Sequence, residues 1–202
     1  MQTIESYTFL HSNIKEIFIP SKVSKICTYT FDHCQNLAKI EFPTDSNLQT
    51  IESHAFEFSN IKEIYFPSSL KKLKEGWCSH VNLLTKISIS PSNGQFFIKD
   101  DKYLLGKTDP NIDEFDNFLF AYRDIKEISI PTNIKIISSH AFEDCKKLTK
   151  VEIPLNSNLQ IIKKVHFHTQ ILKKILIPSK VFEINSDAFS RCRYLTKVEI
   201  PA

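Results

Sequence analysis

The stretch IKEISIPTNIKIISSHAFEDCKK, residues 125–147, is one complete unit of a repeat that extends along the whole chain. Its opening IKEISIP returns seven more times, as IKEIFIP from residue 14, LAKIEFP from 37, IKEIYFP from 61, LTKISIS from 84, LTKVEIP from 148, LKKILIP from 172 and LTKVEIP from 195. The eight starts are 23, 24, 23, 41, 23, 24 and 23 residues apart. A period in the low twenties is too short for a pair of helices and is typical of one turn of a repeat solenoid, in which each turn buries its apolar side against the next.

Each unit of about 23 residues contains two apolar pairs that predict two short extended segments. Ile128 and Ile130 alternate with Ser129, which is strand spacing, and Pro131 ends the strand because it has no N–H to donate. We therefore expect a parallel β-sheet on one face of the solenoid. A second set of pairs predicts short strands or turns on the other face: Val23 with Ile26, Leu48 with Ile51, Ile134 with Ile137 and Val181 with Ile184. The longer units carry the extra residue after the proline, as PTDSNLQTI (43–51) and PLNSNLQII (154–162), where Asp, Ser and Asn favour a turn.

Aromatic residues at one position of each unit predict a stacked core column. Its expected members are Phe9, Phe31, Phe56, Trp77, Phe142, Phe167 and Phe189. Aromatic residues at repeat spacing indicate packing rather than a ligand site.

Composition excludes several classes of protein. The chain has 202 residues, 42% of them hydrophobic, and a net charge of +3 that is spread over the repeats. No apolar run is long enough to cross a membrane, and no basic run alternates with aromatic residues as a nucleic-acid surface requires. Residues 1–20 repeat residues 48–67 almost position for position, so we interpret them as solenoid and not as a signal peptide. The predicted organisation is a single solenoid over 1–202, with N-terminal repeats in 1–90, a hairpin-like insertion in 91–124 and C-terminal repeats in 125–202.

The sequence predicts no catalytic residue, no cofactor and no metal site. It contains no G-x-S-x-G, P-loop or H-E-x-x-H motif and only three glycines. Three of the five cysteines share one position of the repeat, and Cys27 and Cys78 are the other two. The total is odd, so the cysteines cannot all pair within the chain, and the sequence has no C-x-x-C motif. The cysteines of the shared position are Cys34, Cys145 and Cys192. His54 and His140 also share a repeat position, and the His166-x-His168 pair favours a surface role over zinc binding.

Two columns of residues on the outer side of the predicted sheet are the candidates for function. The first column reads Glu16, Lys39, Glu63, Lys86, Glu127, Lys150, Lys174 and Lys197. Its alternating charges favour control of strand register, whereas the last three lysines, with Lys173 beside them, predict an unpaired basic strip. The second column contains apolar residues at Phe18, Tyr65 and Leu176, together with Glu41, which predict anchors for a protein partner.

The stretch 91–124 lengthens one repeat by 18 residues. Its apolar runs FFI (96–98), YLL (103–105) and FLFAY (118–122) predict a projecting hairpin followed by a return strand. Such an insertion either adds to a binding face or acts as an internal spacer.

The unit L-x-x-I-x-I-P-x-x-V-x-x-I-x-x-x-A-F-x-x-C closely resembles the BspA-like (Treponema-type) leucine-rich repeats, and the segments SNLQTIESHAF and SNIKEIYFP look like the set found in protozoan parasites. N-x-x-F (93–96) followed by D-x-x-L-L (101–105) is similar to that family's hairpin insert, with Asp101 where glycine is typical. The resemblance covers essentially the whole chain. It implies a leucine-rich repeat fold and a non-catalytic cell-surface antigen or adhesin that binds host, matrix or cell-surface proteins.

Two other interpretations stay open. The sequence shows no signal peptide, membrane anchor or N-x-S/T sequon. An intracellular interaction scaffold with a cytosolic partner is therefore the alternative to an extracellular adhesion module. The bare strand at 195–200 is also a template for edge-to-edge pairing.

Overall fold

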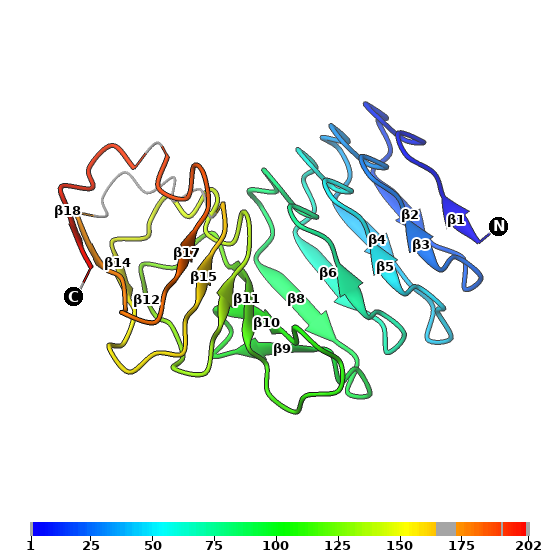
Figure 1. The fold of residues 1–202 in the computed structure, drawn as a ribbon. Coiled ribbons are helices and arrows are strands. Elements are labelled where there is room, and N and C mark those ends of the chain that lie inside the picture. The colour runs from blue at the N-terminus through cyan, green and yellow to red at the C-terminus, as the bar shows by residue number, and fades with distance from the viewer. Residues whose placement is uncertain (1, 165–172, 191, 201–202) are drawn as a thin grey trace. The chain divides into compact units, whose positions relative to one another are not determined.

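The computed structural model describes residues 2–164, 173–190 and 192–200, and all of its regular elements are short β-strands (Figure 1). The chain forms two compact units, residues 1–95 and 96–202. Each unit is built of solenoid turns in which one strand lies on a front face and one on a back face. Across the chain this gives a solenoid of about eight turns with repeats of roughly 23 residues.

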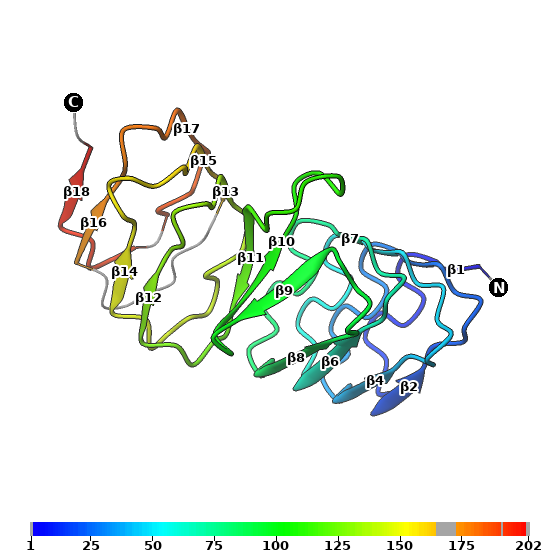
Figure 2. The ribbon, with the colours of Figure 1, turned by 90° about the horizontal axis from the view of Figure 1, so that it is seen from below.

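In the first unit, the back strands form one parallel sheet in the order β1 (Thr3–Ile4), β3 (Lys25–Ile26), β5 (Thr50–Ile51) and β7 (Lys72–Leu73). The front strands are β2 (Glu16–Phe18), β4 (Lys39–Glu41), β6 (Glu63–Phe66) and β8 (Lys86–Ile89), which follow one another along the unit in Figure 2. Both predicted strands of each repeat are therefore present here, because their alternating apolar residues can be buried between the two faces.

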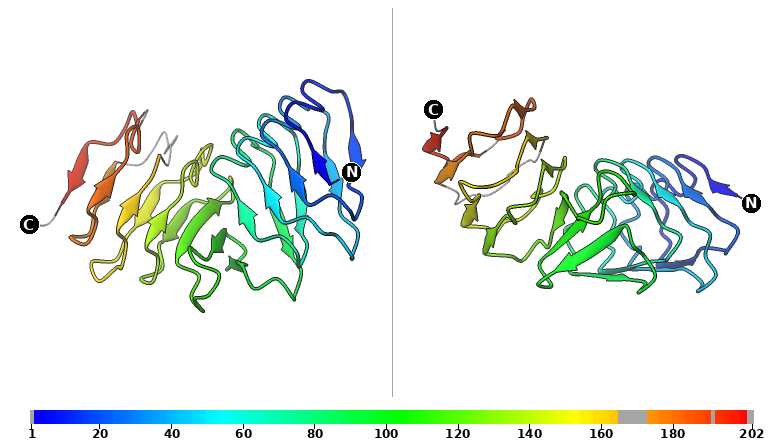
Figure 3. Two further views of the ribbon diagram at one scale, coloured as in Figure 1. Left: turned by 45° about the vertical axis from the view of Figure 1, so that its right-hand side comes forward. Right: turned by 60° about the horizontal axis from the view of Figure 1, so that its bottom comes forward.

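The second unit has the same two faces with a modified beginning (Figure 3). Its back sheet has the order β17 (Glu183–Ile184), β15 (Ile161–Ile162), β13 (Ile136–Ile137), β11 (Asn117–Ala121), β10 (Tyr103–Gly106) and β9 (Phe96–Lys99). Its front strands are β12 (Glu127–Ser129), β14 (Lys150–Glu152), β16 (Lys174–Leu176) and β18 (Lys197–Glu199).

The front strands pair only two by two. The ladders join β2 to β4, β6 to β8, β12 to β14 and β16 to β18, and in each pair the partners are 23 residues apart, as in Glu16 opposite Lys39. Within the described residues, no ladder joins β4 to β6 or β14 to β16, where the repeat is 24 residues long. The longer repeat thus interrupts the front sheet, whereas the back strands stay paired throughout each unit.

The core column of phenylalanine rings is confirmed where the structure describes it. In the first unit, Phe31 stacks on Phe9 and on Phe56 with ring centroids 5.2 and 5.5 Å apart, and Phe56 meets Trp77 edge-on at 6.3 Å. Backbone hydrogen bonds run beside the rings, for example from the Phe31 N–H to the Ala55 carbonyl at 2.8 Å. Phe142 is buried and Phe189 half-buried, while the predicted member Phe167 lies outside the described residues.

Many residues close in sequence to the rings of this column have a left-handed backbone conformation, for example Tyr29 and His33 on either side of Phe31. Positive φ angles of 53–63° occur at Tyr7, His11, Tyr29, His33, His54, Phe58, His80, His140, Asp144 and Asp187. Asp and His tolerate this conformation better than most residues, and Gly76, with φ of 65°, takes it without strain. The rings of the first unit also stack, His11 on His33 at 4.7 Å and Phe58 on His80 at 4.4 Å. The histidines of the repeat thus lie at the corners of the solenoid turns, where the backbone is left-handed.

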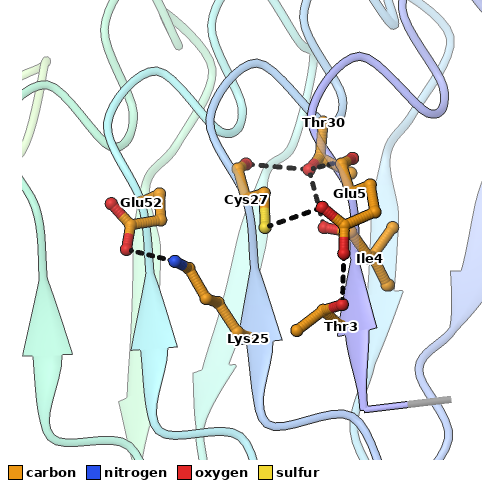
Figure 4. Close-up of polar contacts among 7 residues, drawn as sticks. All are labelled: Thr3, Ile4, Glu5, Lys25, Cys27, Thr30 and Glu52. Carbon is orange, nitrogen blue, oxygen red and sulfur yellow. Dashed lines mark hydrogen bonds and ion pairs between the residues drawn. The ribbon is translucent and has the colours of Figure 1, made fainter.

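Polar contacts connect successive turns on the back face of the first unit (Figure 4). The buried Thr30 hydroxyl donates to the Cys27 carbonyl at 2.8 Å and lies 3.2 Å from the Glu5 carbonyl. The Lys25 ammonium contacts Glu52 of the next turn at 3.1 Å. The Thr30 contacts satisfy a hydroxyl that the stacking of turns removes from water, whereas the Lys25 side chain stays 42% exposed.

The insertion contains the predicted hairpin, but the hairpin does not project. Strands β9 and β10 pair antiparallel, and the turn between them holds Asp101 at φ of 49°, the position where glycine was expected. Strand β10 is buried along its length, and β11 pairs with it on one side and with the back strand β13 on the other. The expectation of a projecting hairpin is therefore wrong, because β10 is buried and lies within the back sheet between β9 and β11. The apolar run FLFAY is the predicted return strand and serves as a back strand of the second unit.

The insertion also adds a ring to the core column that the repeat pattern did not predict. Phe118 is fully buried and stacks on Phe142 with centroids 4.9 Å apart. Nearby, the buried Asp116 carboxylate accepts hydrogen bonds from the Thr108 N–H at 2.9 Å and hydroxyl at 2.8 Å, and it contacts the Lys135 ammonium at 3.1 Å. Burial opposes ionisation of Asp116, but these donors outweigh it, so the pKa of the carboxyl is lowered.

Replacing Phe56 by alanine should destabilise the first unit by about 3–5 kcal/mol, because lost burial and a residual cavity both contribute. Urea unfolding followed by circular dichroism measures the change. Phe18→Ala is the matched control, since Phe18 is 59% exposed and its loss should alter stability by no more than about 0.5 kcal/mol. Equal effects of the two substitutions would contradict the packing of the column.

Asp116→Asn should lower the free energy of unfolding at pH 7 by about 1–3 kcal/mol. The substitution removes the charged acceptor of Thr108 and Lys135, and water cannot replace it in the buried site. The lowered pKa makes the contribution of the carboxylate complete above the unfolded value of about 4, and it is lost as pH falls through the folded pKa. The difference between wild type and variant should therefore shrink between pH 5 and pH 2 in urea titrations. Asp113→Asn, at an exposed carboxylate of the same loop, is the control and should show no such trend.

Candidate functional site

The outward side of the front strands presents the two predicted columns. In β4, β12 and β14, the first and third residues are exposed and the middle residue is buried, as the alternation of side chains along a strand requires. The predicted register is confirmed: Glu16 lies opposite Lys39, and Phe18 lies opposite Glu41. The same pairing sets Glu127 opposite Lys150 and Ser129 opposite Glu152 in the second unit.

On the first unit, two aromatic side chains are exposed on the front strands. Phe18 at the end of β2 is 59% exposed and Tyr65 in β6 is 36% exposed. Glu41 is exposed beside Phe18, and Ser88 lies opposite Tyr65. The front face of this unit therefore combines aromatic surface with a carboxylate, as the sequence predicted.

Leu176 differs from the other two predicted anchors. It lies in β16 opposite Glu199 and is half-buried, not exposed. Its flanking residues Ile175 and Ile177 are each 1% exposed and face the core, so Leu176 lies on the outer side of the strand and keeps part of its surface in water.

The prediction of an unpaired basic strip is wrong. Lys150 pairs with Glu152 of its own strand at 3.2 Å, and Lys174 and Lys197 converge on Glu199 at 2.8 and 2.7 Å. Hydrogen bonds from Lys174 and Lys197 hold the pKa of Glu199 down, at about 2. In the sequence analysis, each lysine was compared only with its counterparts in the same column. The partners come from the neighbouring column: Glu152 and Glu199 lie two residues after Lys150 and Lys197 on the same face, and Glu199 also reaches Lys174 of the adjacent strand.

The same geometry modifies the predicted pairing across strands. Lys86 contacts Glu63 of the neighbouring strand at 3.1 Å, as expected for register control. Lys39 instead pairs with Glu41 of its own strand. Opposite charges are thus in register across the strands, but a lysine on this sheet pairs either with a glutamate of the neighbouring strand or with one of its own strand. Exposed pairs of this kind contribute little to stability.

The cysteines and histidines occupy structural positions. No disulfide joins any of the five cysteines, and burial raises the pKa of the Cys34 and Cys145 thiols and brings that of Cys192 to about 11. His54 and His140 each lie 3.2 Å from the glutamate three residues later in the chain, Glu57 and Glu143. His166 and His168 lie outside the described residues.

The structure has a groove beside Leu176 that the sequence analysis did not predict. It has a volume of about 750 Å³ and lies on the second unit, where the front ladder is interrupted between β14 and β16. Its lining includes Lys150, Lys173 and Lys174, and also Leu155, which is 67% exposed. The signal in the sequence was the 24-residue spacing from 148 to 172.

No helix in the described part of the chain is long and apolar enough to cross a membrane.

Similar solved structures share this fold. The chain aligns over 99% of its length with the pneumococcal vaccine antigen PcpA, with a TM-score of 0.82, 20% sequence identity and 54% of that chain covered. A leucine-rich cell surface protein from Faecalibacterium prausnitzii A2-165 gives a TM-score of 0.73 at 20% identity, with 98% of this chain and 63% of that one covered. A leucine-rich repeat protein from Eubacterium ventriosum gives 0.77 at 20% identity, with 100% and 58% covered. This chain thus spans between 54% and 63% of these relatives.

Comparison of the sequence with curated proteins gives no match. Comparison with family models, in contrast, matches the model described as the BspA type leucine-rich repeat region, in six copies over residues 2–99 and 113–202. The match covers most of both units and leaves out only the part of the insertion that holds the β9–β10 turn, β10 and the loop after it. Repeat unit, strand pairing and family model agree, and the chain belongs to the BspA type leucine-rich repeat family.

Proposed function

We propose that this chain is a non-catalytic protein-binding module that acts as a cell-surface antigen of the adhesin type. The observation that carries the proposal is the exposure of Phe18 and Tyr65 on the front face of the first unit. Aromatic side chains on an exposed sheet lose much water-accessible apolar surface when a partner covers them, and they bring little conformational entropy to lose. The neighbouring Glu41 supplies a charge that orients the partner.

The charged groups of the second unit have a different role in this proposal. Lys150, Lys174 and Lys197 are held by glutamates, so they present ordered ion pairs and not free cations. Ordered pairs at the edge of an interface steer a partner and fix its orientation more than they add affinity. Leu176, half-buried between them, contributes the apolar contact on this unit.

The chemistry of the side chains supports a role without catalysis. A nucleophilic cysteine requires a lowered pKa and access to substrate, but burial raises the pKa of Cys27, Cys34 and Cys145. The buried Asp116 carboxylate is occupied by Thr108 and Lys135. The front columns repeat the same few residue types from turn to turn, which suits an extended contact better than a single reaction centre.

One observation favours a second candidate, an intracellular interaction scaffold. None of the five cysteines forms a disulfide. Proteins of oxidising compartments commonly pair their cysteines, and free thiols are typical of reducing ones. The resemblance to surface proteins supports the first candidate: PcpA is described as a vaccine antigen and the F. prausnitzii relative as a cell surface protein.

Substitution of Phe18, Tyr65 and Leu176 by serine should weaken binding to a protein partner at least tenfold, because each truncated anchor of an interface costs more than about 1 kcal/mol. Biolayer interferometry against a panel of purified matrix and host-surface proteins identifies a partner of the wild type and then measures the variant. The matched control replaces three exposed apolar residues off the front strands, Leu10, Leu83 and Phe182, by serine. Unchanged affinity in the front-face variant, with circular dichroism confirming the fold, would refute the assignment of the anchors.

Protease treatment of intact source cells distinguishes the two candidates. A surface protein should be cleaved by external protease while a cytosolic marker in the same cells stays intact. Protection of the chain until lysis would exclude the surface role and support the intracellular scaffold. Immunoblotting of both proteins over the time of digestion provides the measurement.

A further inference from the structure

The groove on the second unit arises from the interruption of its front sheet. Within the described residues, β14 and β16 share no ladder, and the groove opens between them. The wall on one side is formed by Thr149, Lys150, Val151, Glu152, Ile153, Pro154 and Leu155, and the other wall by Lys173, Lys174 and Leu176. The groove therefore follows the direction of two strands and can hold an extended chain segment.

Part of the lining of the groove is apolar. Leu155 is 67% exposed and follows the turn proline of the 24-residue repeat, and Leu176 of β16 also lines the groove and keeps part of its surface in water. Val151 and Ile153 are almost fully buried and close the groove toward the core. A leucine exposed to this degree at the edge of an apolar groove gains from being covered by another apolar side chain.

The rim of the groove carries an excess of positive charge. Three of its lining residues are lysines and one is a glutamate. Lys150 and Lys174 have glutamate partners, but no ion pair within the described residues involves the exposed Lys173. An acidic group can therefore approach Lys173 without displacing an existing partner, whereas the charges of Lys150 and Lys174 are offset by Glu152 and Glu199.

The corresponding place in the first unit has different residues. The repeat sets Phe42 where the second unit has Ile153, Tyr65 where it has Leu176, and Thr44 where it has Leu155. Glu63 corresponds to Lys174 and pairs with Lys86. The first interruption thus has larger rings and balanced charge, whereas the second has smaller side chains and more lysine, so the lining of the groove is not a general property of the repeat.

We infer that this groove binds an acidic, extended peptide segment of a partner protein. One apolar side chain of the segment packs between Leu155 and Leu176, and a carboxylate next to it pairs with Lys173. The inference rests on the proposed protein-binding function and assigns the chemistry of the partner on the second unit. It makes Leu155 and Lys173, neither of which belongs to the predicted anchors, determinants of specificity.

A phage-displayed library of random 12-residue peptides, selected on the full chain, tests the inference. Peptides selected on wild type and depleted on the Leu155→Ser, Lys173→Glu double variant should be enriched in Asp and Glu next to Leu, Ile or Phe. Synthetic versions should bind the wild type at least tenfold more tightly than either single variant in fluorescence polarisation. Their affinity should also fall between 50 and 300 mM salt, because an exposed charge pair is screened.

Matched substitutions in the first unit provide the controls. Lys62→Glu and Thr44→Ser change the positions that correspond to Lys173 and Leu155, and they should leave peptide affinity unchanged. Groove-dependent peptides without acidic enrichment, or a library that yields no groove-dependent peptide, would overturn the inference. Either result leaves the protein-binding proposal standing if the Phe18, Tyr65, Leu176 variant still loses its partner, so failure of the groove and failure of the proposed function can be told apart.

Discussion

Stacking of one turn on the next, with phenylalanine on phenylalanine, is the constraint on which the rest of each unit depends. A single turn of about 23 residues cannot enclose Phe31 or Ile26, and both become fully buried only when neighbouring turns cover them. The rings fix the turns at centroid distances near 5 Å, and the backbone hydrogen bonds of the back strands follow at the same spacing. Register on the front face, and therefore the position of every exposed side chain, is a consequence of this stacking.

Repetition explains why so much of the fold could be predicted from the sequence. Once one unit is assigned, Glu16 must lie opposite Lys39 and Phe18 opposite Glu41, because the strands begin 23 residues apart. Prediction failed where the period was broken. Phe118 belongs to the core column, but it lies in the insertion, where counting from repeat to repeat gives no position for it. FLFAY was recognised as a strand, yet only the pairing of β11 with β13 shows that it is a back strand of the unit.

The candidate site could be predicted only in part, for a different reason. Exposure of Phe18 follows from alternation along the strand, which the sequence encodes directly. Pairing of Lys174 and Lys197 with Glu199 depends on side-chain conformation, and a strand pattern does not determine which of two nearby acids a lysine selects. In the sequence analysis, the histidines were assigned no role, whereas His33, His54 and His140 have a left-handed conformation that His and Asp tolerate better than most residues.

Alternation of 23- and 24-residue spacings means that the front face is assembled from pairs of turns. A pair comprises 47 residues, the same distance that separates residues 1–20 from their near copy at 48–67. Loss or gain of one turn would leave a strand without its ladder partner and would bring like charges together in the column. A segment of 47 residues can be duplicated or deleted with ladders, charges and ring column all restored at the new junction. The double turn is thus the unit by which this architecture can lengthen, and addition of whole double turns extends the front face and keeps the existing contacts between turns.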